Sequence, residues 1–383
     1  MKKILLFSRD PGGSNTIIPL VEPLQKRGYE VRLFGKDIAL EKYRMANLSG
    51  FNIMNYISSI KLDFIKNFIT DEEPDFIITG TSANDFTEKY IWKAAGELKI
   101  PSFAILDQWV NYGVRFSNYG ISQLDDYNKD KNHSYVPSKI CVMDDIAESE
   151  AINEGLEQER IIITGQPYFE IVLKKSDSIT NKAIKSIRDK AGLSINDFLI
   201  TFASEPISDT YNENDFSEHY WGYTERTIFR ELLDVILQVS KLYPNKIGLI
   251  IRQHPKENSS NFSDIIDNFK SSRIKIIINR DFDQHELIMA SDLICGMSSM
   301  FLIEAAILDK LVMSIQIGLK RENPLILDRV NCLKSILDKQ TLLNVLRLII
   351  MGENTPRCYF NIIKNPVENV ILQMEKMLCQ NLQ

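Results

Sequence analysis

Short apolar runs alternate with amphipathic segments along almost the whole sequence, and this alternation is the strongest constraint on the fold. A short apolar run suits a strand that is buried on both faces of a sheet. The segments between the runs have the spacing of helices with one apolar face. Strands joined through helices form parallel sheets with right-handed crossovers, so we predict an α/β protein with doubly wound parallel sheets. The expected strands are 3–7, 30–34, 76–80, 102–106, 139–143, 161–165, 198–203, 246–251, 274–278, 293–295 and 311–315, and the main helices are 16–27, 85–99, 145–154, 224–241 and 365–378.

Chain length and one break in the pattern predict two domains. The chain has 383 residues, and domains of about 100 to 200 residues are typical. The polar stretch 171–195 interrupts the alternation and suits a linker between Rossmann-like domains over 1–170 and 196–360. The amphipathic helix within 361–383 is expected to pack back on the N-terminal domain.

Composition argues against several classes of protein. Lys and Arg total 45 against 51 Asp and Glu, and a formal charge of −6 does not favour nucleic acid as a partner. The apolar run near the start is too short for a signal peptide, and no apolar stretch reaches the roughly 18 residues of a membrane span. The five cysteines have no CxxC spacing and are expected to be reduced. We therefore expect a cytoplasmic protein.

Two polar segments about forty residues apart each follow a predicted strand of the second domain. The first contains Arg252, His254 and Pro255, and the second contains Ser298 and Ser299. Open α/β sheets bind ligands at the carboxyl ends of their strands. Hydroxyls and free N–H groups at a helix start suit a phosphate, and an imidazole held next to a proline suits a phosphate or a leaving nucleotide. Ordinary helix capping by the serines is the alternative.

Two further residues of the second domain belong to this predicted nucleotide site. Glu304 lies between Ile303 and Ala305 on an apolar helix, where a charge has little structural purpose, and binding to ribose hydroxyls would supply one. Ser204 follows the strand 198–203 and is expected to add a contact to the phosphate or the base.

The first predicted strand of the N-terminal domain leads into a Gly-rich loop with Asp10, Gly12, Gly13, Ser14 and Asn15. The loop lacks both the GxGxxG fingerprint and the lysine of a P-loop. Adjacent glycines still allow a close approach of backbone to ligand, so we expect a floor for an acceptor or a diphosphate. A plain turn from strand to helix is the alternative.

Asp107 ends another predicted strand and is our candidate general base. The residues that follow it are unusually polar and aromatic, and include Trp109, Asn111 and Tyr112. The aromatic rings could line a sugar site or raise the pKa of the carboxylate. A helix cap is the alternative for Asp107. Asp85 and Glu88 are weaker candidates, because both are expected at the start of a helix.

A metal site is not expected. The four histidines have no HxxxH or HExxH spacing. One DxD string, 281–283, precedes a predicted helix, and we expect Asp283 to cap that helix rather than to bind Mg²⁺.

With these residues identified, the chain resembles the GT-B superfamily of nucleotide-sugar glycosyltransferases over nearly its whole length. The stretch 163–168, ITGQPY, looks like a TGxP segment that closes the N-terminal domain of such proteins. His254-Pro255 and Ser298-Ser299 are similar to the HP and SS motifs of bacterial sialyltransferases and polysialyltransferases, which use CMP-sugars. The acidic motif of those families has two acidic residues and a glycine, whereas Asp107-Gln108 lacks the glycine. The HP and SS elements also resemble those of CDP-glycerol glycerophosphotransferases, and a similar HP occurs in UDP-GlcNAc 2-epimerases.

The resemblance implies two Rossmann-like domains that face each other across a cleft. Residues 1–170 would bind a saccharide or glycoconjugate acceptor, and 196–360 would bind the nucleotide-sugar. The implied activity is that of a metal-independent, inverting glycosyltransferase of surface-polysaccharide assembly, with a CMP-sugar favoured and no cofactor. Peripheral association with the inner face of the membrane would suit that role. The alternatives are a hydrolysing epimerase similar to UDP-GlcNAc 2-epimerases, a CDP-glycerol-type transferase, and a non-catalytic nucleotide-sugar-binding protein.

Overall fold

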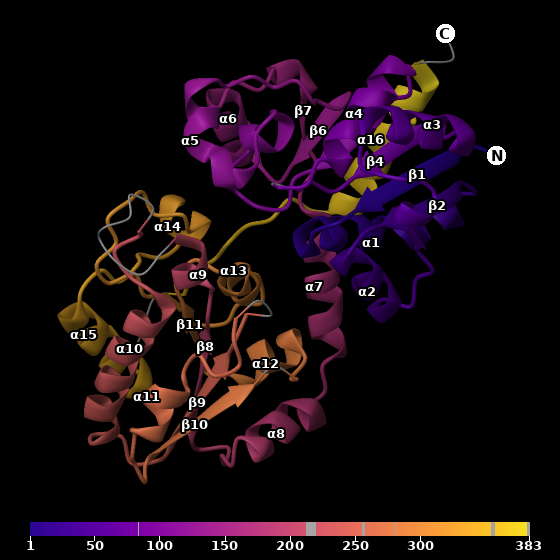
Figure 1. Cartoon of the computed structure of the whole chain (residues 1–383). Helices are drawn as coiled ribbons and strands as arrows, with labels where there is room; N and C mark the ends of the chain where they lie inside the picture. The colour runs from indigo at the N-terminus through magenta and orange to yellow at the C-terminus, as the bar shows by residue number, and fades with distance from the viewer. Residues whose placement is uncertain (83, 212–219, 255–256, 280, 354–356, 381–383) are drawn as a thin grey trace. The chain divides into compact units, whose positions relative to one another are not determined.

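The chain forms two compact units, each built around one parallel β-sheet (Figure 1). Unit 1 comprises residues 1–171 and 362–383, and unit 2 comprises residues 172–361. The computed structural model describes residues 1–82, 84–211, 220–254, 257–279, 281–353 and 357–380. No helix in these ranges is long and apolar enough to cross a membrane.

Unit 1 has a seven-stranded sheet in the order β3-β2-β1-β4-β5-β6-β7, and all neighbouring strands are parallel. The strands are β1 (Lys3–Ser8), β2 (Glu30–Gly35), β3 (Phe51–Asn52), β4 (Phe76–Thr79), β5 (Ser102–Ile105), β6 (Lys139–Val142) and β7 (Ile161–Ile163). The helices are α1 (Pro11–Lys26), α2 (Ile38–Met45), α3 (Leu62–Glu72), α4 (Thr87–Glu97), α5 (Leu124–Lys129), α6 (Asp145–Asn153) and α16 (Pro366–Gln380), and α7 (Pro167–Ser178) spans the boundary between the units. Short 3-10 helices cover η1 (Ile53–Asn55), η2 (Gly113–Phe116), η3 (Ile121–Gln123) and η4 (Gln158–Arg160).

Strand β1 shows why this sheet needs helices on both faces. Successive side chains of a strand point to opposite faces. Ile4 and Leu6 belong to a cluster with α1 and α16, whereas Leu5 and Phe7 belong to a cluster with α3 and α4. All four side chains are fully buried, so neither face of the strand is left to solvent.

Unit 2 has a five-stranded parallel sheet in the order β10-β9-β8-β11-β12. The strands are β8 (Phe198–Ala203), β9 (Ile247–Arg252), β10 (Ile274–Asn279), β11 (Leu293–Gly296) and β12 (Val312–Ser314). The helices are α8 (Asn181–Lys190), α9 (Ile207–Tyr211), α10 (Glu225–Ser240), α11 (Ser263–Asp267), α12 (Gln284–Ala290), α13 (Met300–Ile307), α14 (Ile326–Arg329) and α15 (Lys339–Ile350). The predicted class, an α/β protein with two doubly wound parallel sheets, is confirmed.

The first helix differs from the prediction. We expected a loop at 10–15 and a helix from residue 16, but α1 begins at Pro11, which stands at its first position. Proline is well suited there because its fixed φ is helical and its missing N–H would have no helical partner. The glycines that we placed in a loop therefore lie in the first turn of α1.

The segment expected as a linker and the C-terminal helix are each anchored by hydrogen bonds, the first to unit 2 and the second to unit 1. Within 171–195, Arg188 of α8 donates to the Ala290 carbonyl at 3.0 Å and to Asp292 at 3.1 Å, both in unit 2. Helix α16, yellow in Figure 1, belongs to unit 1. There Asn369 donates to the Thr164 carbonyl at 3.0 Å, and Arg27 of the α1 C-cap pairs with Glu368.

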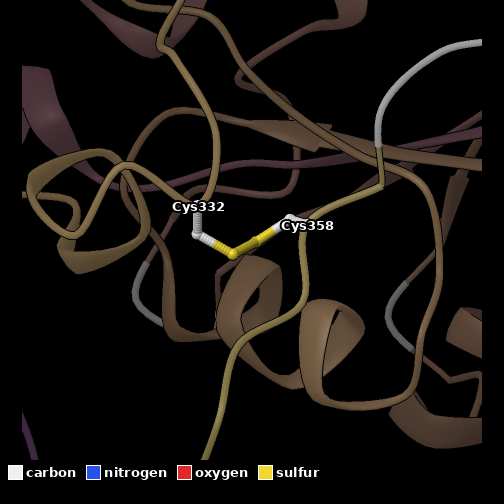
Figure 2. Close-up of a disulfide and its surroundings, with 2 residues drawn as sticks. All are labelled: Cys332 and Cys358. Carbon is white, nitrogen blue, oxygen red and sulfur yellow. A yellow bond between two sulfur atoms is a disulfide. The ribbon is translucent and has the colours of Figure 1, made fainter.

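Two of the five cysteines are joined. Cys332 and Cys358 form a disulfide within unit 2, with their Cα atoms 4.9 Å apart (Figure 2). The expectation of reduced cysteines is therefore wrong for this pair. The pairing was missed because two cysteines 26 positions apart form no local motif in the sequence. Cys141 and Cys295 are buried free thiols, and Cys379 is an exposed one.

Purified without reductant and then denatured, the chain should show three reactive thiols, since two of its five cysteines are paired. Replacing Cys358 with Ser should lower the free energy of unfolding by about 3 kcal/mol, as expected for the loop that this bond closes. Thiol titration and urea unfolding would measure both. Cys379→Ser is the matched control and should leave stability unchanged; five reactive thiols without reductant would contradict the pairing.

Candidate functional site

In unit 2, the turn between β11 and α13 binds a carboxylate of the protein itself. Glu205 accepts a hydrogen bond from the Ser298 N–H at 2.6 Å and another from the Ser298 hydroxyl at 2.8 Å. The backbone N–H groups of Met297 and Ser299 also act to lower the pKa of Glu205, against the larger effect of burial. We call the three consecutive N–H groups of residues 297–299, together with the Ser298 hydroxyl, the amide cradle. Consecutive free amides at the start of a helix suit the binding of anions.

The two serines of the predicted phosphate site thus have different partners. Ser298 contributes to the amide cradle, whereas Ser299 is the N-cap of α13 and accepts from the Phe301 N–H at 3.2 Å. The capping alternative therefore holds for Ser299.

A second carboxylate, Glu257, joins the ends of β8 and β9. It accepts from the Ser204 hydroxyl at 2.7 Å and from the His254 N–H at 2.5 Å. Asn261 donates to it at 3.1 Å. Glu257 is only 4% exposed. Burial raises its pKa, and the hydrogen bonds from these donors oppose that rise. Two of the predicted nucleotide-binding residues, Ser204 and His254, are therefore held at one edge of the sheet by Glu257.

The carboxylate of Glu304 faces α12. It accepts from Gln284 at 2.6 Å, and the ring of His285 lies 3.2 Å away. Gln284 in turn accepts a hydrogen bond from Arg252 at 3.1 Å. The guanidinium of Arg252 also lies over the ring of Phe301, 4.6 Å from the ring centre. Predicted residues Arg252 and Glu304 are thus connected through one glutamine. Pro255 lies outside the described residues, as do Lys256 and the stretch 212–219.

In unit 1, the Gly-rich start of α1 makes two close backbone approaches. A Cβ atom on Gly12 would lie 1.6 Å from Oδ2 of Asp107, and a Cβ on Gly13 would lie 3.3 Å from the Cα of Gly80. Only glycine fits both contacts without a shift. The predicted loop and the predicted base are therefore in contact through Gly12.

Asp107 is paired with an arginine that the sequence did not suggest. Arg115 donates to Asp107 at 3.0 Å and to the Thr81 hydroxyl at 2.7 Å. Asp107 is 8% exposed, so burial raises its pKa while the Arg115 charge opposes that rise. The nearby backbone is unusual, since Asn111 has a φ of 56° and its carbonyl accepts from Arg115 at 3.1 Å.

The other predicted residues of this region have structural partners. Trp109 donates to Asp144 at 2.8 Å and stacks on Phe169 with ring centres 6.0 Å apart, and it is 3% exposed. The ring of Trp109 thus packs within unit 1, and its role as a wall of a sugar site stays a prediction. Tyr112 is likewise buried and donates to Glu150 at 2.7 Å.

Charged and polar groups near the start of α1 form pairs. Asp10 is bound by Arg9 at 2.7 Å. Ser14 accepts from Ser8 at 3.0 Å, and Asn15 accepts from Lys42 at 2.9 Å. These contacts hold the first turn of α1 against β1 and α2.

Glu88 of α4 is a buried carboxyl of unit 1 with a strongly raised pKa. It is 1% exposed, and the Ser82 hydroxyl donates to one of its oxygens at 2.8 Å. The other oxygen finds no hydrogen-bond partner among the described residues. Burial raises the pKa of Glu88 to about 8. The neighbouring candidate, Asp85, instead pairs with Lys36 at 2.6 Å.

The second aspartate of the DxD string, Asp283, caps a helix as predicted. Asp283 is the N-cap of α12 and accepts from the N–H groups of His285 and Glu286. Within the described ranges, no group of three or more His, Cys, Asp or Glu side chains is arranged to hold a metal ion.

Several solved structures that resemble this chain are of UDP-GlcNAc 2-epimerases. No protein-family model matches the sequence, and no curated protein is detectably similar to it. The UDP-GlcNAc 2-epimerase of Methanocaldococcus jannaschii aligns over 98% of this chain and 99% of its own, with a TM-score of 0.65 and 16% identity. That of Neisseria meningitidis, bound to UDP-GlcNAc, aligns over 98% and 100%, with a TM-score of 0.63 and 15% identity.

A glycosyltransferase of Rickettsia africae aligns over all of this chain and 97% of its own, with a TM-score of 0.58 and 15% identity. At such identities the likeness shows the fold, which is GT-B-like. The predicted fold class is thereby confirmed over the length of the chain.

Replacing Glu88 with Gln should make stability less dependent on pH. The unfolded carboxyl ionises near 4.5, whereas the folded one keeps its proton to about 8, so the wild type loses stability as pH rises between these values. The advantage of Glu88→Gln should therefore grow across this window by more than about 1.4 kcal/mol, the value of one pKa unit. Urea unfolding at several pH values would measure it. Asp71→Asn, which removes an exposed carboxylate of α3, is the control; parallel curves for Glu88→Gln and wild type would contradict the prediction.

Proposed function

We propose that this chain is an enzyme that acts on a nucleotide-sugar and binds the nucleotide through unit 2. The observation that carries the proposal is the full-length likeness to UDP-GlcNAc 2-epimerases, one of them bound to UDP-GlcNAc. The amide cradle supports it, because amides and a hydroxyl at a helix start suit a phosphate. His254 and Glu304 both belong to unit 2 and are proposed to contact the leaving phosphate and the ribose.

Of the possible reactions, we favour inversion at C2 of a UDP-N-acetylhexosamine. Such a reaction removes the proton from C2 while the bond between C1 and the nucleotide breaks. A proton then returns to the other face of C2 while the nucleotide, or a water, adds back at C1. In this proposal Asp107, buried beside Arg115, moves the proton, and the amide cradle with His254 binds the developing charge. We expect no metal ion to be needed, because these groups would supply the stabilisation.

Transfer of the sugar to an acceptor is the second candidate. The pairing of Asp107 with Arg115 suits this reaction as well, since the carboxylate would be held in place to deprotonate an acceptor hydroxyl. The likeness to the Rickettsia africae glycosyltransferase agrees with it at the level of the fold. The donor would then be a nucleotide-sugar, with a CMP-sugar as the specific proposal, and the acceptor a saccharide or glycoconjugate at the inner face of the membrane.

The products made from UDP-GlcNAc alone separate the two candidates. An epimerase should form the C2 epimer, either still attached to UDP or as a free sugar together with free UDP. In D2O the product should carry deuterium from the solvent at C2. NMR would detect both without an acceptor. A transferase should release nucleotide only when an acceptor is present, and a binding protein should show a nucleotide-dependent rise in melting temperature without any product. Melting curves with UDP, CMP, CDP and GDP would identify the nucleotide.

His254→Ala should lower turnover about 100-fold while leaving the fold intact. The contact of residue 254 with Glu257 uses the backbone N–H, which alanine retains, so the edge of the sheet should stay in place. Steady-state kinetics with the active donor would measure the loss, and the melting temperature would serve as the control. Wild-type turnover in this variant would remove His254 from the proposed mechanism.

A further inference from the structure

Glu205 occupies the amide cradle in the way that an anionic ligand would. The Ser298 N–H and the Ser298 hydroxyl each donate to one oxygen of its carboxylate, at 2.6 and 2.8 Å. Glu205 follows β8, whereas the amide cradle follows β11, 93 positions along the chain. The group that binds there is therefore supplied by a different segment.

We propose that Glu205 is a resident anion of the phosphate site, which a nucleotide phosphate displaces in order to bind the same N–H groups. Glu205 would then set how strongly a phosphate must bind before the site accepts it. The inference rests on the proposed function for the identity of the ligand, but not for the anion-binding character of the amide cradle.

Glu205 is not needed as a helix cap. Ser299 already caps α13 through its contact with the Phe301 N–H. A carboxylate that leaves water for this position loses hydration, and burial raises the pKa of Glu205 despite the two hydrogen bonds from Ser298. A phosphate group brings three acceptor oxygens and a larger charge to the same donors, so it can replace one carboxylate there.

The backbone on both sides of Glu205 is anchored, so displacement needs only a rotation of its side chain. On one side, the Ser204 hydroxyl donates to Glu257 at 2.7 Å. On the other, the Ser208 N–H and hydroxyl donate to Glu225 at 3.0 and 2.7 Å. A ligand can therefore enter while the turn after β8 keeps its place.

Isothermal titration with UDP and with inorganic pyrophosphate tests the proposal on the wild type and on Glu205→Gln. Both ligands should bind Glu205→Gln at least about tenfold more tightly, because a like charge in the site opposes an incoming anion. Asp209→Asn is the matched control. Asp209 is an exposed carboxylate of α9, and its removal changes the net charge equally without touching the amide cradle, so affinity should stay at the wild-type value.

A second variant, Glu205→Asp, retains the charge but shortens the side chain by one methylene, so its carboxylate should leave the amide cradle. Glu205→Asp should bind pyrophosphate more tightly than the wild type. If melting curves show that Glu205→Gln does not fold, the affinity of Glu205→Asp tests the proposal in its place. Equal or weaker pyrophosphate binding in the folded variants would overturn the proposal. Tighter pyrophosphate binding with no UDP binding would support the resident anion and refute the nucleotide function instead.

Discussion

A parallel strand that is covered on both faces has no face left for polar side chains, and this constraint determines where chemistry can occur in both units. Leu5 and Phe7 of β1 pack to one side and Ile4 and Leu6 to the other, so polar groups accumulate where the strands end. At those ends the following helices supply N–H groups without helical partners. The same packing that buries the sheets therefore creates donors for anions at their edges.

The carboxylates at these edges are bound mostly by the protein itself. Asp107 is held by Arg115, Glu257 by Ser204 and the His254 N–H, and Glu205 by the amide cradle. Burying an ionised carboxylate is costly unless donors compensate it, and each of these groups has such donors. A ligand for either edge must consequently compete with contacts that already exist. Glu88 differs, because one of its oxygens lacks a partner among the described residues and its pKa rises to about 8.

The sequence allowed good predictions wherever a local pattern determines the structure. The runs at 198–203 and 76–80 became β8 and β4 nearly to the residue, and Asp283 caps α12 as its position suggested. The start of α1 was missed, because two glycines are poor helix formers and suggested a loop. Arg115, Glu205 and Glu257 were missed as partners for a different reason. Their roles depend on contacts between separate segments, such as Glu205 with Ser298, and no spacing in the sequence encodes such a pairing. The Cys332–Cys358 bond escaped prediction on the same grounds.

The division of unit 1 between the two ends of the chain has a consequence for its synthesis. Unit 2 is one continuous segment, 172–361, and all of it is synthesised before α16. Leu20 and Leu24 of α1 belong to the same core cluster as Val370, Ile371 and Met374 of α16. Before α16 is synthesised, these apolar positions of α1 therefore lack the side chains that cover them. The unit that begins first is therefore the unit that finishes last, and nascent chains should depend on protection of the α1 surface for as long as unit 2 is being translated.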